Sequence, residues 1–177
     1  MNDLTRVLSD EHKNILRVIK TLKRECGEIE NGKAIDKDYF LAAIDFIRNY
    51  ADKFHHAKEE DILFKALCGD SVEMHCNPTE QMLYEHNLGR DLVKNLETGV
   101  NEGDKQKVLD NARGYAYLLE DHISKEDNIL YPMACEALPA ETQNSIRQEF
   151  LSVEMEKFTP EVKEKYLKMV GDFEKRV

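Results

Sequence analysis

The sequence predicts an all-α protein, an up-down-up-down four-helix bundle with additional C-terminal helices. Apolar residues recur at steps of three and four through four long segments, which is the period of an α-helix with one buried face. Short connections separate the segments, and such connections place successive helices antiparallel. The 177 residues include only 8 glycines and 4 prolines, which disfavours an all-β protein with its many tight turns.

The acidic composition argues against two classes of partner. Lys and Arg total 25 and Asp and Glu total 35, so the formal net charge is −10. A nucleic-acid-binding protein needs a basic surface, and so does a protein that binds an anionic membrane. No apolar run reaches the roughly 18 residues of a membrane span, and the start, MNDLTRVLSDEHK, lacks the apolar core of a signal peptide. We therefore expect a cytoplasmic protein with neither kind of partner.

The four cysteines are expected to be unpaired thiols. Cys26, Cys68, Cys76 and Cys135 form no CxxC pair, and a disulfide framework is unusual in a chain of this length without a secretion signal. His75, which precedes Cys76, is interpreted as incidental.

Capping residues and glycines mark the ends of the first two helices. The first is predicted to start near Ser9, a favourable N-cap, and to stop before Gly32. The second is predicted to run from near Asp36 to Gly69.

The third and fourth helices have equally clear signals. Asn77 is expected to cap the third, with Pro78 at its first helical position and Glu80 closing a capping box. The run ETGVNEGD, with its two glycines, ends it. The fourth pattern covers residues 108–133, and Pro132 is expected to kink or end the regular helix because proline removes a backbone donor.

The remaining residues are predicted to add two short helices, the second of which opens at Thr159-Pro160. We interpret residues 1–138 as the four-helix domain. Residues 139–177 are interpreted as a helical appendage that packs on the bundle or on a partner chain.

Six polar residues occupy positions where the helical period calls for a buried apolar side chain. They are His12, His55, Glu59, His86, His122 and Glu126. Burying such groups is costly unless they find strong partners, and metal ions are such partners. The i, i+4 spacing places His55 with Glu59, and His122 with Glu126, on one face of each helix.

An internal repeat relates these residues. The segment HHAKEEDILFKA, from His55, aligns with HISKEDNILYPM, from His122, and EHKNILRVIKTL, from Glu11, aligns with EHNLGRDLVKNL, from Glu85. The chain therefore reads as two copies of one helical hairpin. Four imidazoles and two carboxylates from four facing helices could surround two metal ions, with carboxylates bridging and imidazoles terminal.

Other polar residues near these positions are assigned outer roles. His56 and Glu60 also lie four residues apart, but they share a mostly polar face with Asn49 and Asp52, so we expect them at the surface or behind the ligands. Three acidic residues adjoin a candidate ligand in sequence and are expected to orient neighbouring groups: Glu11, Glu85 and Asp121.

The donor set indicates the class of metal. Nitrogen and oxygen ligands without thiolate suit iron or manganese better than structural zinc. Ferritin-like proteins place Glu three residues before His. Here His precedes Glu by four residues, which excludes the ferritin-like pattern.

Four motifs in this arrangement resemble the hemerythrin-like (hemerythrin/HHE cation-binding) family. They are Glu11-His12, HHAKEEDILF at 55–64, YEHNL around His86, and DHISKEDNILYP at 121–132. The resemblance spans residues 8 to about 135 and implies an oxo- or hydroxo-bridged centre of two iron ions.

The resemblance also implies a role for each candidate ligand. Glu59 and Glu126 would bridge the two ions. The terminal histidines would be His12 and His55 on one iron, and His86 and His122 on the other.

The chain departs from the oxygen-carrying hemerythrins at one position. Those proteins have a further histidine four residues before the one that matches His86, and Met82 stands there in this chain. One iron is therefore expected to lack its third imidazole, which leaves more positions open to small ligands. Tyr84, Tyr115 or Tyr50 is a candidate to fill the vacancy.

The sequence thus predicts a di-iron protein that binds or reduces dioxygen, peroxide or nitric oxide, with reversible oxygen transport disfavoured. The alternative is a module that senses oxygen or iron, or stores iron, without turnover; a structural domain with a degenerate site is the third possibility. Whether the protein is an oxidoreductase stays open, as do a homodimer contact and a redox partner.

Overall fold

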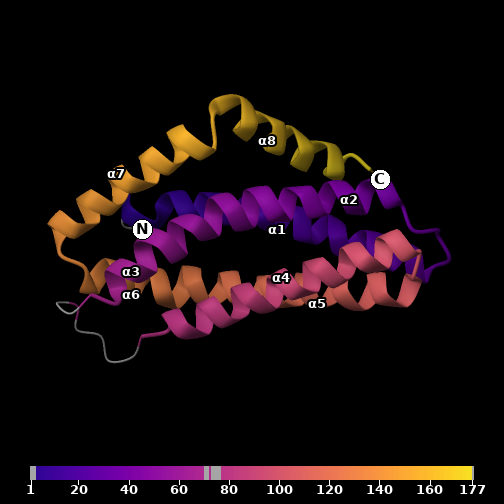
Figure 1. Cartoon of the computed structure of the whole chain (residues 1–177), viewed down its shortest axis with the longest axis horizontal. Coiled ribbons are helices and arrows are strands. Elements are labelled where there is room, and N and C mark those ends of the chain that lie inside the picture. The colour runs from indigo at the N-terminus through magenta and orange to yellow at the C-terminus, as the bar shows by residue number, and fades with distance from the viewer. Residues whose placement is uncertain (1–2, 70–71, 73–76, 177) are drawn as a thin grey trace.

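The computed structural model describes residues 3–69, 72 and 77–176. Four long helical rods lie along one another, and two further helices cross one side of them (Figure 1). The elements are α1 (Asp3–Glu30), α2 (Lys37–Phe46), η1 (Ile47–His56), η2 (Glu59–Leu63), α3 (Phe64–Leu67), α4 (Thr79–Glu102), α5 (Lys105–Lys125), η3 (Glu126–Leu130), α6 (Tyr131–Ala137), α7 (Ala140–Lys157) and α8 (Pro160–Glu174). The predicted all-α bundle is confirmed, and the part of the chain described here contains no strand.

The rods follow the predicted order, but the first begins earlier than predicted. Helix α1 already begins at Asp3, so the prediction that Ser9 caps it is wrong. The Ser9 hydroxyl instead donates to Oδ1 of Asp127 at 2.6 Å. Asp36 caps α2 as predicted, accepting from the backbone N–H of Tyr39 at 3.0 Å.

The third rod, α4, begins one residue later than predicted. Its first residue is Thr79, and Oδ1 of Asn77 accepts from the Thr79 N–H at 3.0 Å, so Asn77 satisfies a free donor of the first turn. Gly103, with φ +70°, ends α4 in the left-handed conformation that glycine adopts without strain. His75 and Cys76 lie outside the described residues.

The second and fourth rods contain π-helical segments: η1 and η2 in the second, and η3 in the fourth. In the fourth rod, regular α-helix ends at Lys125. Pro132 is the second residue of α6 and does not end the rod, which continues to Ala137. A π-helical turn shifts the backbone hydrogen bonds by one residue and often marks a functional site.

The buried apolar residues form two clusters, one toward each end of the bundle. On α1, Leu8 belongs to one cluster and Ile15 to the other, and His12 lies between them. The polar residues singled out from the sequence therefore occupy a layer between two apolar layers, which exclude water from it.

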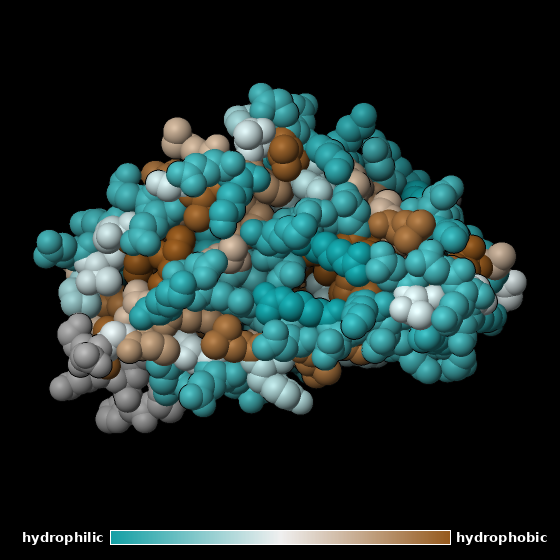
Figure 2. Space-filling model, viewed as in Figure 1, coloured by the Kyte–Doolittle hydropathy of each residue, from teal (hydrophilic) through white to brown (hydrophobic). Residues whose placement is uncertain are grey.

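Helices α7 and α8 pack on the first two rods. The ring of Phe158, between α7 and α8, stacks on Phe54 of η1 with ring centroids 3.9 Å apart. Hydrophilic side chains cover most of the face seen in Figure 2. Among the described residues, no helix is long and apolar enough to cross a membrane.

Candidate metal centre

The six residues predicted from the sequence converge in the layer between the two apolar clusters. None is more than 2 % exposed. Potential ligand atoms fall into two groups, within each of which all lie within 4.8 Å of one another. The first group is His12, His55, Glu59 and Glu126, and the second is His56, His86 and His122.

Two carboxylates connect the two groups. Oε2 of Glu126 lies 3.3 Å from Nε2 of His12, and Oε1 lies 3.1 Å from Nε2 of His122. Oε2 of Glu59 lies 3.5 Å from Nε2 of His55 and 3.6 Å from Nε2 of His86. Each carboxylate thus contacts one histidine from each half of the chain, which is the position of a bridging ligand.

Three of the carboxylate oxygens have no hydrogen-bond partner among the described residues: Oε2 of Glu59 and both oxygens of Glu126. Imidazole Nε2 atoms lie 3.1 to 3.6 Å from these oxygens. Burying ionisable groups together in this way costs several kcal/mol, and metal coordination removes that cost. The residues therefore fit a metal centre better than a hydrogen-bonded polar core.

Carboxylates behind the histidines fix the orientation of the rings. Within each repeat, Nδ1 of the histidine on the second helix faces the glutamate of the Glu-His pair on the first. The distances are 2.9 Å from His55 to Glu11 and 2.8 Å from His122 to Glu85. Because Nδ1 is engaged outside the centre, Nε2 points into it. The orienting role expected of Glu11 and Glu85 is confirmed.

The other two histidines are held across the repeats. Nδ1 of His12 lies 3.1 Å from Oδ1 of Asp127, and Nδ1 of His86 lies 2.7 Å from Oε1 of Glu60. Asp121, which the sequence suggested for such a role, is exposed. The repeat aligns Asp127 with Glu60, and that alignment was the available signal for their shared role.

Local backbone geometry also departs from the regular helix that the i, i+4 spacing assumed. His55 lies in η1, and Glu59 and Glu126 are the first residues of η2 and η3. Glu59 and Glu126 therefore occupy equivalent π-helical positions in the two repeats.

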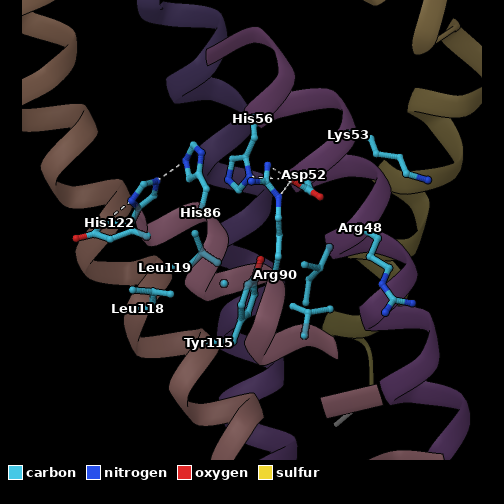
Figure 3. A pocket seen from close by; sticks show the side chains of 14 residues that line it. Arg48, Asp52, Lys53, His56, His86, Arg90, Tyr115, Leu118, Leu119 and His122 are labelled. Carbon is cyan, nitrogen blue, oxygen red and sulfur yellow. Dashed lines mark hydrogen bonds and ion pairs between the residues drawn. The ribbon is translucent and has the colours of Figure 1, made fainter. Parts of the chain in front are cut away.

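His56 is buried, so the predicted surface position is wrong, whereas its other predicted position, behind the ligands, stays a prediction. It is 6 % exposed, and its ring stacks on that of His86 with centroids 3.7 Å apart. Figure 3 shows His122, His86 and His56 side by side. The polar face that suggested exposure is covered by α4, from which Arg90 reaches Asp52, and Oδ1 of Asp52 in turn lies 3.3 Å from Nδ1 of His56.

Tyr131 adds a donor that sequence reasoning missed. Its buried hydroxyl donates to Oε1 of Glu59 at 2.6 Å and lies 3.4 Å from Nε2 of His12. The repeat aligns Tyr131 with Phe64. The extra hydroxyl group of Tyr131 in this alignment was the one signal in the sequence that could have indicated its role.

The tyrosines proposed to compensate for Met82 do not converge on the centre. Tyr84 is 64 % exposed, and the Tyr50 hydroxyl accepts from Nδ2 of Asn14 at 3.1 Å. Tyr115 lines a cavity beside His86. His56 is the residue that stands next to His86 and His122 instead.

The pKa values of the two central carboxyl groups shift in opposite directions. Burial, and then the neighbouring Glu126, raise the pKa of Glu59. Burial acts in the same direction on Glu126, but His122, His12 and His86 outweigh it and hold its pKa well below the usual range. A proton shared by the pair is therefore favoured on Glu59 over Glu126.

Comparison with known proteins gives one match. A family model described as the hemerythrin HHE cation binding domain matches residues 3–134. The search of curated proteins and the search of solved structures found no match.

Proposed function

Because the chain belongs to the hemerythrin HHE cation-binding family, we propose that its buried centre holds two iron ions and that the protein binds or reduces dioxygen, peroxide or nitric oxide. The observation that supports this most is the set of three buried carboxylate oxygens without hydrogen-bond partners in the described chain, faced by imidazole Nε2 atoms. Bound iron supplies redox and Lewis-acid chemistry.

The geometry suggests a role for each of the six residues. Glu59 and Glu126 are the proposed bridging ligands, since each contacts histidines of both halves. They stand between the proposed terminal ligands of one ion and those of the other. The terminal pairs are His12 with His55, and His86 with His122.

The surrounding side chains prepare the centre for its cations. Asp127 and Glu60 direct two imidazoles inward, and Tyr131 holds one oxygen of Glu59 so that the other is free to bind metal. The apolar layers on either side lower the local dielectric, which strengthens the electrostatic interactions inside.

Anaerobic titration with ferrous iron tests the proposal. The wild-type protein should bind two equivalents, and Glu59→Gln and Glu126→Gln should each bind fewer. Glu25→Gln is the matched control, because Glu25 is also buried but pairs with Lys33 away from the centre. A wild-type stoichiometry far below two, or full loading of both central variants, would contradict the proposal.

Ligand sensing without turnover is the second candidate. Lys58 pairs with Glu11, which contacts His55, and its Nζ also lies 3.8 Å from Oε1 of Glu154 on α7. These contacts connect the centre to the C-terminal helices, so a change at the centre could alter the position of α7. Steady-state consumption of peroxide by the iron-loaded protein separates the two. Sustained consumption supports turnover, whereas a single stoichiometric spectral change supports sensing.

A further inference from the structure

The two repeats differ at two positions on the side of the centre where His86 lies. Gly89 on α4 aligns with Ile15 on α1, and His56 aligns with Ile123. Ile15 and Ile123 are both buried and fill the interior on their side. At Gly89 no side chain occupies the corresponding space.

A cavity of about 350 Å³ lies at this position. It extends from the exposed Lys53 to the buried group of His56, His86 and His122 (Figure 3). Pockets of this size are typical of sites for small organic molecules, and an apolar cavity of about 150 Å³ already holds benzene. The space is larger than a diatomic ligand needs.

Apolar groups form much of the wall. They come from Ile47, Val93, Leu118 and Leu119, together with the ring of Tyr115. Gly89 leaves room beside that ring: a Cβ atom there would lie 3.5 Å from Cε2 of Tyr115, so any larger side chain would enter the cavity. These walls favour a ligand with an apolar body.

The guanidinium groups at the rim are already paired. Arg48 donates to both carboxylate oxygens of Glu97, at 2.8 and 2.7 Å. Arg90 donates to Asp52 and to Glu60, each at 2.7 Å. These carboxylates neutralise both guanidinium groups. Lys53, the remaining basic side chain of the lining apart from the histidines, donates to Oδ1 of Asn49 at 3.3 Å and is exposed, so solvent weakens its attraction for an anion.

One polar group on the wall lacks a partner. The Tyr115 hydroxyl is buried, with the residue 2 % exposed, and no described residue forms a hydrogen bond with it. In Figure 3 the hydroxyl end of the ring points toward the side where Arg90 and His86 lie. A buried unpaired hydroxyl is costly, and a ligand that bonds to it removes the cost.

We propose that this cavity binds an uncharged organic molecule that has an apolar body and one hydroxyl or hydroperoxyl group, which pairs with the Tyr115 hydroxyl beside His56 and His86. The proposal deepens the function proposed above by naming a ligand class for the same centre. It rests on that function only for the role of iron, because the cavity itself is formed by the chain.

Calorimetric titration of the iron-loaded protein with three probes tests the ligand class. Benzyl alcohol should bind with one equivalent. Toluene, which lacks the hydroxyl, should bind more weakly by about three- to tenfold, the contribution of one hydrogen bond. Benzoate should bind about tenfold or more weakly than benzyl alcohol, because its charge finds no partner. Equal or tighter binding of benzoate would overturn the assignment of an uncharged ligand.

Two variants test the location. Gly89→Ile copies the other repeat and should weaken benzyl alcohol binding about tenfold or more by filling the space. Tyr115→Phe keeps the space, so it should weaken benzyl alcohol to the level of toluene and leave toluene unchanged. Gly27→Ile is the matched control, since no described residue lies within 4 Å of the added Cβ in α1, and it should bind as the wild type does.

Benzyl alcohol binding that is absent from the wild type, or unaffected by both Gly89→Ile and Tyr115→Phe, overturns the proposal. The iron content of each sample distinguishes this from failure of the proposed function. Two irons without benzyl alcohol binding contradict only the cavity proposal. Benzyl alcohol binding by a protein that takes up no iron during loading supports the cavity proposal and contradicts the di-iron function.

Discussion

The ammonium group of Lys58, which has no exposed surface, pairs with Oε1 of Glu11, and the other oxygen of the same carboxylate lies 2.9 Å from Nδ1 of His55. The second repeat has the same arrangement, in which Lys125 pairs with Glu85 behind His122. This relationship explains why the repeat contains lysine three residues after histidine. The lysine neutralises the carboxylate that orients the ring.

The two lysines should differ in their effect on stability. Lys58→Met leaves the buried Glu11 carboxylate without its cation and should lower the free energy of unfolding by about 3–5 kcal/mol. Lys125, with 38 % of its side chain exposed, is the matched control, and Lys125→Met should cost about 1 kcal/mol or less. Denaturant unfolding of the iron-loaded variants measures both, and equal losses would show that burial of Lys58 does not matter.

Features that depend on a single helix could be predicted from the sequence. The period of apolar residues located the rods, and the six polar interruptions of that period are the six buried residues of the centre. The repeat aligned Glu59 with Glu126, and the structure places these two residues at equivalent positions, as the first residues of η2 and η3.

Features that depend on contacts between helices were not visible in the sequence. His56 shares a polar face, but Arg90 from another rod covers that face and buries it. Ser9 is a favourable cap, yet it lies inside α1, where its hydroxyl bonds to Asp127 on η3. The π-helical turns have no signature in a pattern of threes and fours, because each adds only one residue to a turn.

Removal of the Tyr131 hydroxyl should weaken metal binding. In Tyr131→Phe, Oε1 of Glu59 loses its donor, so the carboxylate is less well positioned, and iron affinity should fall by about 10- to 100-fold. Competition with a chelator measures the change. Tyr39→Phe is the control, since the Tyr39 hydroxyl bonds to Thr21 far from the centre. An affinity loss in Tyr39→Phe as large as that in Tyr131→Phe would assign the effect to general destabilisation.

We propose that His56 adds a third imidazole to the pair of His86 and His122, which should make the two metal positions unequal. We expect two distinct iron environments in the Mössbauer spectrum of the wild type, because three imidazoles adjoin one position and two the other. His56→Ile places the residue of the second repeat at this position and should make the two environments more alike, with about 10-fold or greater loss of affinity at one position. A spectrum and affinity unchanged by His56→Ile would show that His56 is not a ligand.

Iron binding should strengthen as the pH rises and should release protons. Burial lowers the pKa of His12, but Asp127 and Glu126 outweigh it and raise the pKa to about 9. In the metal-free protein this imidazole therefore holds a proton at neutral pH, and a metal ion must displace it. Apparent affinity should increase between about pH 6 and pH 9 and level off above the pKa.

Calorimetry in buffers with different ionisation enthalpies measures the protons released. In Asp127→Asn the carboxylate that contributes to the raised pKa of His12 is gone, so fewer protons should be released at neutral pH and the affinity should level off at a lower pH. Asp10→Asn is the control, because Asp10 is an exposed residue of α1 that pairs with Lys13. An affinity that stays constant across this range in the wild type would contradict the protonated state of His12.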